Sequence, residues 1–472
     1  MSFSAARRRD QTPSKTNVII GVMVVAAFIM ILNETIVSIA LPQLARTLSV
    51  TASTAQWLVS GFLVTMGVVI PTTGFLIDRF APRAIFLTAV SSFTLGTALC
   101  AIAPNFQALL AGRIVQACGT AVMIPLVMTS VMRLVPAYKR GAMMGTISIV
   151  IGVAPAIGPT VGGAVLAALT WRWMFWLVLG LTLILFAIGF FFLQVPSQRK
   201  DTPLDVGSVV LSALGFAGLV YGLSSIGQAE VAYLPWIALA VSSVALVSFV
   251  WRQIVLQGQD RPLLDLRTLR FARFRLGVVM SVLVFMALLG AGAILLPIYL
   301  QSVLGHGTFA AGLALLPGGL AMAAVSRPAG TLYDRIGARP LMIPGAIGMA
   351  AALWLFAALG AGAPLGLVIA THVLLMLSLG TMMTPLMADA LGALPDDLHS
   401  HGSALFATLQ QVSGALGASV FVAVAALASR TAGEIPDARG LAAGFGLAGC
   451  FGLIAVGTAF LFKRPRSIPA PA

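Results

Sequence analysis

The chain has 472 residues, of which 59% are hydrophobic and 9% charged, and its mean hydropathy is +1.02. Soluble domains carry about 25% charged residues, so this composition excludes an ordinary globular protein and predicts a chain embedded in a lipid bilayer. The net charge of +14 does not indicate a nucleic-acid partner, because the basic residues concentrate in alternate loops, as the positive-inside rule describes.

Apolar segments recur along the whole chain, each long enough to cross a hydrocarbon core of ~30 Å. Backbone polar groups in lipid must be satisfied within the segment, so we expect every span to be a helix. The predicted spans are residues 17–41, 54–77, 84–103, 107–134, 142–167, 173–194, 206–226, 235–254, 276–300, 310–332, 341–361, 364–387, 402–428 and 441–462. Of the 28 Lys and Arg residues, 22 fall at the chain ends and in alternate loops. This bias predicts fourteen spans with both termini in the cytoplasm.

A ten-residue pattern occurs twice, at residues 74–83 and 330–339. Each copy begins with Gly, has an Asp-Arg pair four residues later, ends in Arg, and follows an apolar helix. Two copies predict a duplicated six-helix unit, as in transporters whose halves rock around a midplane site. The expected organisation is an N-terminal six-helix bundle (1–194), two inserted transmembrane helices (195–254), a linker (255–275) and a C-terminal six-helix bundle (276–472).

The linker carries arginines at every third position, Arg267, Arg270 and Arg273. This spacing predicts an amphipathic helix that lies in the cytoplasmic interface and anchors the two halves. A regulatory site is the alternative.

Other classes of site have little support. No Gly-x-x-x-x-Gly-Lys loop is present to bind a nucleotide, and the four histidines provide no catalytic constellation at membrane depth. The segment 388–401 contains Asp396, Asp397, His399 and His401, which we interpret as a solvated loop, not a metal site. We therefore expect a transporter driven by an ion gradient, and neither an enzyme nor a metal protein.

Five motifs in chain order resemble those of the major facilitator superfamily, specifically its fourteen-helix branch of drug:proton antiporters. They are residues 32–42, the loop 74–83, residues 112–119, residues 152–163 and residues 171–175. The resemblance implies an all-α integral membrane protein with the major facilitator fold, in which two six-helix bundles have two extra helices inserted between them. It also implies proton-driven transport without a cofactor.

Glu34 and Arg113 are the candidate proton-coupling residues. Glu34 lies well inside the first apolar helix, where a carboxylate costs ~2.5–3.5 kcal/mol on insertion scales, so we expect it to face the bundle interior. Arg113, midway along the fourth span, is the candidate partner, and a proton and a cationic substrate would compete for the carboxylate. A static ion pair is the alternative. The branch more often has an aspartate where Asn33 stands, and a shift of one helical position turns the side chain by ~100°.

The repeated loops and the fifth span are the candidate conformational gate. The resemblance implies that the repeated loops hold the two halves together. Charge that only sets the orientation in the membrane explains the arginines, but it does not explain the repeated Gly and Asp. In the fifth span, Gly158 and Gly162 permit close helix packing. The gate candidates are Gly74, Asp78, Arg79, Arg83, Gly330, Asp334, Arg335, Arg339, Pro155, Gly158, Pro159, Gly162 and Gly163.

Candidates for substrate contact are polar, aromatic or pliable residues on helices expected to line a central cavity. Met and aromatic side chains adapt to varied apolar ligands, and paired amides are costly in lipid. The candidates are Asn33, Gln56, Trp57, Gln116, Met123, Tyr299, Gln410 and Gln411.

The expected function is proton-coupled efflux, by antiport and alternating access, of hydrophobic, cationic drugs or toxic small molecules. An importer or exporter of a cellular metabolite, such as an aromatic or organic acid, is the alternative. The expected partners are a small-molecule substrate, protons and the lipid bilayer, with no nucleic acid. We expect a monomer in the inner (cytoplasmic) membrane of a bacterial cell and leave accessory efflux proteins open.

Overall fold

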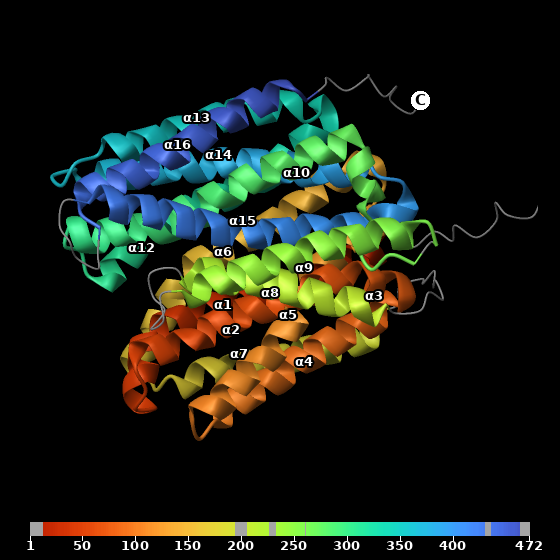
Figure 1. Ribbon diagram of the computed structural model, residues 1–472, viewed down its shortest axis with the longest axis horizontal. Helices are drawn as coiled ribbons and strands as arrows, with labels where there is room; N and C mark the ends of the chain where they lie inside the picture. Colours follow the sequence, from red (N-terminus) through yellow and green to blue (C-terminus); the bar gives the residue numbers. More distant parts are fainter. Residues whose placement is uncertain (1–12, 194–204, 226–232, 260, 430–435, 463–472) are drawn as a thin grey trace, which may run out of the picture.

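The structure is a computed structural model that describes residues 13–193, 205–225, 233–259, 261–429 and 436–462. In this part of the chain, fourteen helical segments are long and apolar enough to cross a membrane, and they run side by side along the long axis of the molecule (Figure 1). The predicted all-α fold with fourteen spans is confirmed. Most of the basic residues near the two chain ends lie in segments 1–12 and 463–472, outside the described residues.

The first six spans include one broken helix. They are α1 (Pro13–Thr47), the combination of α2 (Ala52–Val69), η1 (Ile70–Thr72) and α3 (Thr73–Arg79), then α4 (Pro82–Ile102), α5 (Phe106–Leu134), α6 (Arg140–Ala168), preceded by η2 (Ala137–Lys139), and α7 (Arg172–Phe192). Pro71 lacks a backbone N–H, and the second span tightens to a 3₁₀ turn around it. At the start of α5 the Asn105 side chain accepts a hydrogen bond from the backbone N–H of Ala108 at 2.9 Å, which caps the helix.

The two inserted helices are α8 (Val206–Ser225) and α9 (Leu234–Gln257). They lie between the two halves of the stack in Figure 1, where α8 packs against α2 of the first half and α15 (His399–Ala428) of the second. The outer face of α9 is apolar and exposed, including Val244, Val247 and Trp251. Such a face is suited to lipid.

The second half opens with an irregular span. This span combines α10 (Ala272–Phe285), the π-helix η4 (Met286–Leu295), α11 (Leu296–Ile298) and the π-helix η5 (Tyr299–Val303). The remaining spans are α12 (Thr308–Ile336), α13 (Arg339–Ala358), α14 (Leu365–Gly392), α15 and α16 (Ala438–Phe460). Pi-helical turns are uncommon and occur frequently at functional sites, and η4 does contribute to the central cavity described below.

The linker between α9 and α10 differs from the prediction. Leu263 and Leu264 are each only 1% exposed, and their backbone N–H groups donate to the Gln253 side-chain oxygen at 2.8 and 3.1 Å. The Asp265 N–H donates to His401 Nδ1 at 3.3 Å, and only the short 3₁₀ helix η3 (Leu266–Arg270) follows. The prediction of an amphipathic surface helix is wrong, because buried leucines and a buried amide hold this segment between α9 and α15.

The segment 388–401 also differs from the prediction. Helix α14 continues to Gly392, and α15 begins at His399 after the short helix η6 (Asp396–Leu398). His399 and His401 are 1% and 7% exposed, so the prediction of a solvated loop is wrong for both histidines. Among the described residues, no group of three or more His, Cys, Asp or Glu side chains is arranged to hold a metal ion.

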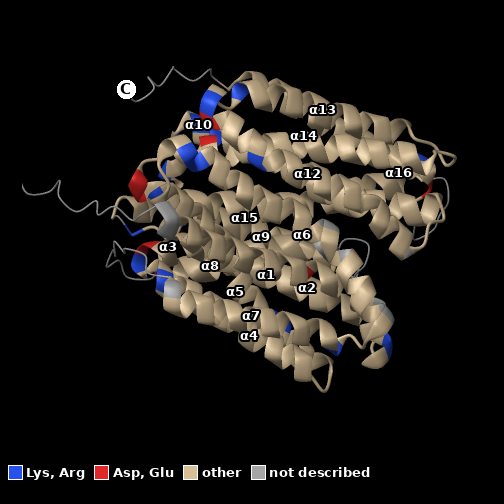
Figure 2. Cartoon of the chain, turned by 180° about the vertical axis from the view of Figure 1, so that it is seen from behind, with Lys and Arg blue, Asp and Glu red and all other residues tan. Residues whose placement is uncertain are grey.

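Charged residues gather at one end of the helices, which we call the basic end, whereas most of the helix length is uncharged (Figure 2). The two halves also meet there: α6 packs along α12, and α3 packs on α15.

Candidate functional site: a central cavity and contacts between the halves

A cavity of about 260 Å³ lies between the two halves. Its wall is mainly apolar, with six polar side chains: Glu34 and Thr35 from α1, Thr120 from α5, His372 from α14, and Gln410 and Gln411 from α15. The apolar wall includes Ile31, Met66, Ile70, Ile124, Pro125, Ile151, Phe285, Leu288, Leu289, Leu315 and Met376. A concave apolar site with a few converging polar groups is the usual form of a small-molecule site.

Glu34 provides the one carboxylate at the cavity wall among the described residues. In the described part of the chain its carboxylate makes no hydrogen bond and no direct ion pair. An ionised group costs a great deal to bury unpaired. Glu34 is therefore placed to bind a proton or a cation that enters the cavity.

The expected direct contact between Glu34 and Arg113 is not present. Arg113 is fully buried, and its guanidinium donates to the Leu58 carbonyl at 3.2 Å and to the Gln116 side-chain oxygen at 3.0 Å. It also lies 4.2 Å from the centre of the Phe62 ring. The two charges lie within electrostatic range of each other, but Arg113 is held by α2 and by its own helix, away from the carboxylate.

Adjacent positions on α1 have different surroundings. Glu34 faces the cavity, while Asn33 is fully buried and its side-chain amide has no hydrogen-bond partner among the described residues. The rotation of ~100° per residue explains the difference. Thr35, the next residue, lines the cavity and packs beside Gly158 of α6.

Two of the eight predicted substrate contacts, Gln410 and Gln411, line the cavity. The other six do not line it. Asn33 and Met123 are fully buried, Gln116 bonds Arg113 and Thr97, Tyr299 donates to the Gly360 carbonyl, Gln56 is exposed, and Trp57 stacks on Tyr221 of α8.

Several lining residues were not among the sequence-based candidates. Thr35, Thr120 and the π-helical residues Leu288 and Leu289 resemble ordinary helix residues in the sequence, and no signal distinguishes them. His372 does have a signal, since it is an ionisable side chain within an apolar span.

At the basic end, the first copy of the repeat contacts α15. Asp78 binds Arg133 of α5 at 2.9 Å, accepts a hydrogen bond from the Ser400 hydroxyl, and lies 3.6 Å from His401 Nε2. A side chain at Gly74 would place its Cβ 2.9 Å from His401 Nδ1. The glycine therefore permits α3 to approach α15 closely.

The second copy makes the corresponding contact with α6. Asp334 accepts the backbone N–H groups of Gly141 and Ala142 at 2.8 and 3.0 Å. A carboxylate at a helix N-terminus satisfies free amides and interacts favourably with the helix dipole. A Cβ at Gly330 would lie 2.1 Å from the Gly141 carbonyl oxygen. In both copies, Gly and Asp join one half of the molecule to the other.

Two arginines of the first copy contact phenylalanine residues. Arg79 lies over the rings of Phe75 and Phe80, and Arg83 donates to the Phe190 carbonyl at 2.7 Å. Arg335 is exposed, and Arg339 begins α13 half-buried.

The remaining gate candidates lie on α6. Pro155 lines the cavity, Gly158 and Gly162 pack against Thr35 and Ile36 of α1, and a Cβ at Gly163 would lie 3.9 Å from the Phe309 ring. Pro159 lies within α6, and its side chain is outside the described residues.

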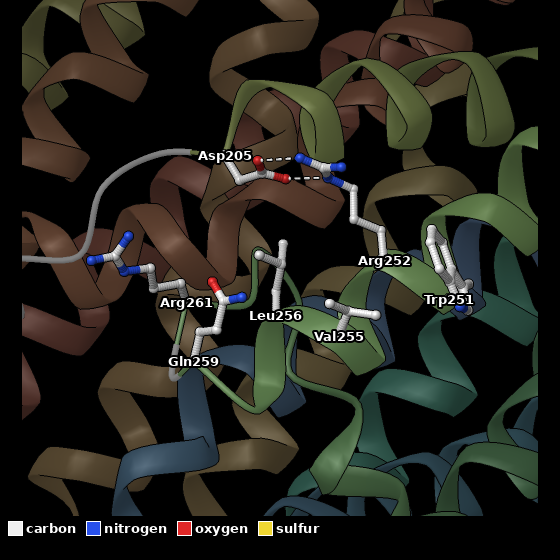
Figure 3. Close-up of a pocket in the computed structure, with 7 residues that line it drawn as sticks. All are labelled: Asp205, Trp251, Arg252, Val255, Leu256, Gln259 and Arg261. Carbon is white, nitrogen blue, oxygen red and sulfur yellow. Dashed lines mark hydrogen bonds and ion pairs between the residues drawn. The ribbon is translucent and has the colours of Figure 1, made fainter.

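A second hollow of about 500 Å³ lies at the basic end of α8 and α9 (Figure 3). Arg252 binds Asp205 through two hydrogen bonds of 2.7 and 2.8 Å, while Gln259 and Arg261 lie to one side of this pair. The hydrogen bonds from the Arg252 guanidinium hold the pKa of Asp205 well below its usual range.

Replacing the Asp205 carboxylate should lower the thermal stability slightly, by an amount that does not depend on pH near neutrality. A depressed pKa adds stability above the unfolded pKa of about 3.9, and this stability is lost as the pH falls through the folded pKa. We expect Asp205→Asn to lower the midpoint of thermal unfolding by about 1–3 °C, equally at pH 5 and pH 8. Gln259→Ala, in the same hollow, is the control. A lowering of the unfolding midpoint by Asp205→Asn that differs between pH 5 and pH 8 would contradict a depressed pKa of Asp205.

The Major Facilitator Superfamily description matches residues 23–418 of this sequence. The chain belongs to the major facilitator superfamily. The lincomycin resistance protein LmrB of Listeria monocytogenes is 37% identical over 449 residues, which cover 92% of this chain and 93% of that protein. The putative multidrug resistance protein MdtD of Klebsiella pneumoniae is 31% identical over 83% of each chain.

The human organic anion transporter MFSD10 has a similar structure, with a TM-score of 0.69, 16% identity, and coverage of 95% of this chain and 100% of that one. At this identity the likeness concerns the fold alone. Membership of the superfamily establishes the chain as a membrane transporter of small molecules and not an enzyme.

Proposed function

We propose that this transporter exports hydrophobic, cationic drugs or toxic compounds in exchange for protons. The observation that carries the proposal is the Glu34 carboxylate, which has no hydrogen-bond or ion-pair partner among the described residues and lies in an apolar cavity between the halves. A proton and a substrate cation are alternative partners for one such group. Each must leave before the other binds, and this competition couples their movements.

The contacts of Asp78 and Asp334 between the halves support a direction for this exchange. By the positive-inside rule the basic end lies in the cytoplasm, here of a bacterial cell, and both termini lie on that side. In this proposal Asp78 and Asp334 hold the cytoplasmic side closed during the outward-facing half of an alternating-access cycle. Protons that enter from outside would reach Glu34 and displace the drug, and the proton gradient supplies the energy without a cofactor.

The relatives suggest the first compound to test. Lincomycin, named in the LmrB relative, carries a tertiary amine that is protonated near neutral pH. Labelled lincomycin should accumulate less in efflux-deficient bacteria that express this chain than in bacteria with an empty vector. A protonophore should abolish the difference.

Equal accumulation with and without the chain, for lincomycin and for a panel of cationic dyes, would contradict drug export. Export that persists with the protonophore would contradict proton coupling. An aromatic or organic acid transported in place of the cations would favour the alternative function.

A further inference from the structure

The hollow at the basic end of α8 and α9 contains hydrogen-bond donors that the protein leaves unused. Arg252 donates to Asp205 from Nε and from Nη2. Its third nitrogen, Nη1, has no acceptor among the described residues. The Arg261 guanidinium also has no hydrogen-bond or ion-pair partner in the described part of the chain. Arginine carries five donors and no acceptor, so both side chains are available to an anion.

The fold holds the Arg252 guanidinium in one position. A Cβ at Gly207 of α8 would lie 3.0 Å from both Cζ and Nη2 of Arg252. The planar group therefore packs against the backbone at the start of α8, while the Asp205 carboxylate binds one edge of it. A donor that is already held in place loses little conformational entropy when a ligand binds. Arg252 is thus a preorganised donor in the wall of the hollow, with 40% of its side chain exposed.

The charges at the hollow favour an anion. The charged residues that line it, within the described part of the chain, are Arg252, Arg261 and Asp205. Because Arg252 and Asp205 neutralise each other through two hydrogen bonds, Arg261 leaves a net positive charge. Arg261 is exposed and lies to one side of the pair in Figure 3. A phosphate group suits this site, since the guanidinium fork binds phosphate oxygens through pairs of donors.

An exposed apolar stripe of α9 leads to the same hollow. Its members are Val244, Val247, Trp251 and Ile254, which are 69%, 71%, 67% and 58% exposed. Steps of three and four residues place them on one face of the helix. Trp251 also lines the hollow, and tryptophan is enriched where the hydrocarbon meets the lipid headgroups. The stripe therefore lies at the depth of acyl chains, and the hollow lies at the depth of headgroups.

We propose that this hollow is a binding site for an anionic phospholipid. The lipid phosphate binds Arg261 and Arg252, and the acyl chains lie along the apolar stripe of α9. The hollow of about 500 Å³ is within the range of ligand sites, about 300–1,000 Å³. A soluble anion would leave the stripe without a partner, whereas a phospholipid matches both the positive charge and the apolar face beside it.

The fluorescence of Trp251 can report which lipid occupies the site. The full-length protein is reconstituted in mixtures of phosphatidylglycerol, which is anionic, and phosphatidylcholine, which is zwitterionic. One of the two lipids carries brominated acyl chains, which quench nearby tryptophans, and the label is then exchanged between them. Trp251→Phe, measured in parallel, subtracts the emission of the other six of the seven tryptophans. In wild type we expect phosphatidylglycerol to bind beside Trp251 about fivefold more tightly, the effect of one basic residue near the membrane surface.

Two variants should move this preference in opposite directions. Arg261→Gln removes the net positive charge and should lower the preference to about twofold or less. Asp205→Asn frees the Arg252 charge from its carboxylate and should raise the preference to about twentyfold. Arg270→Gln is the matched control, since Arg270 is an exposed arginine of the same linker that does not line the hollow. It should leave the preference unchanged.

Equal binding of the two lipids beside Trp251 in wild type would overturn the proposal. A preference that Arg261→Gln and Arg270→Gln reduce equally would also overturn it, because it would reflect the overall charge of the basic end. Relief of quenching by millimolar inorganic phosphate would overturn a lipid occupant and indicate a soluble anion. A loss in both Arg261→Gln and Asp205→Asn would contradict the charge argument, since only opposite shifts follow from it.

Discussion

Replacing Glu34 with Gln is expected to abolish proton-coupled export and leave the fold intact. Gln is nearly isosteric with Glu, but it neither releases a proton nor attracts a cation. Loss of a charge-assisted contact weakens binding by roughly 10- to 100-fold, and loss of the titrating group removes the coupling entirely. Drug accumulation in cells that express Glu34→Gln should therefore equal that with an empty vector.

The same variant distinguishes a coupling group from a structural ion pair. If Glu34 were half of a static buried pair, removing its charge would cost about 3–5 kcal/mol of stability. Because Arg113 is instead held by Leu58 and Gln116, we expect the midpoint of thermal unfolding to be unchanged or raised, since a neutral amide is cheaper to bury than a carboxylate. Glu34→Asp, which keeps a titratable group, is the matched control and should retain partial export. A strongly destabilised Glu34→Gln protein would support the structural alternative.

Gly330→Ala is expected to cause the second largest loss, through the gate. The added methyl group would lie 2.1 Å from the Gly141 carbonyl oxygen, a contact that real Cβ atoms essentially never make, so α12 and α6 must separate. Separation also pulls Asp334 from the N-terminus of α6. We expect at least a tenfold lower export rate, because the cycle can no longer hold the state closed at the basic end.

A thiol reporter measures this opening directly. Thr384 is fully buried, and its methyl group would lie 2.9 Å from the same added Cβ. In a background without Cys100, Cys118 and Cys450, Thr384→Cys should react slowly with a water-soluble reagent and faster once Gly330→Ala is added. Gly457→Ala, at a helical glycine with open space around it, is the control and should change neither rate. Unchanged labelling and export in Gly330→Ala would show that this contact does not form the gate.

Features encoded by local composition could be predicted from the sequence. The fourteen spans follow from runs of apolar residues, and the repeated Gly and Asp were recognisable from their spacing alone. The structure brings both copies to the same end and gives each one a partner helix from the opposite half, Ser400 and His401 for Asp78 and the start of α6 for Asp334.

Features that depend on helix rotation and long-range packing could not be predicted. Nothing in the sequence indicates that the Leu58 carbonyl holds Arg113 or that Asn33 turns away from the cavity. The arginine spacing in the linker predicts a surface helix, whereas Leu263 is buried and its backbone N–H donates to Gln253, ten positions earlier. The spacing of residues along a helix shows which of them share a face. It does not show whether that face meets lipid, water or another helix.

Proton release from proteoliposomes tests the central claim most directly. Vesicles with an acidic lumen and a pH-sensitive dye inside should show a rise in luminal pH when lincomycin is added outside, because drug enters in exchange for protons. Vesicles with Glu34→Gln should show no rise, and those with Glu34→Asp a smaller one. Drug uptake by wild type without a pH change, or an unchanged signal from Glu34→Gln, would contradict proton-coupled export through Glu34.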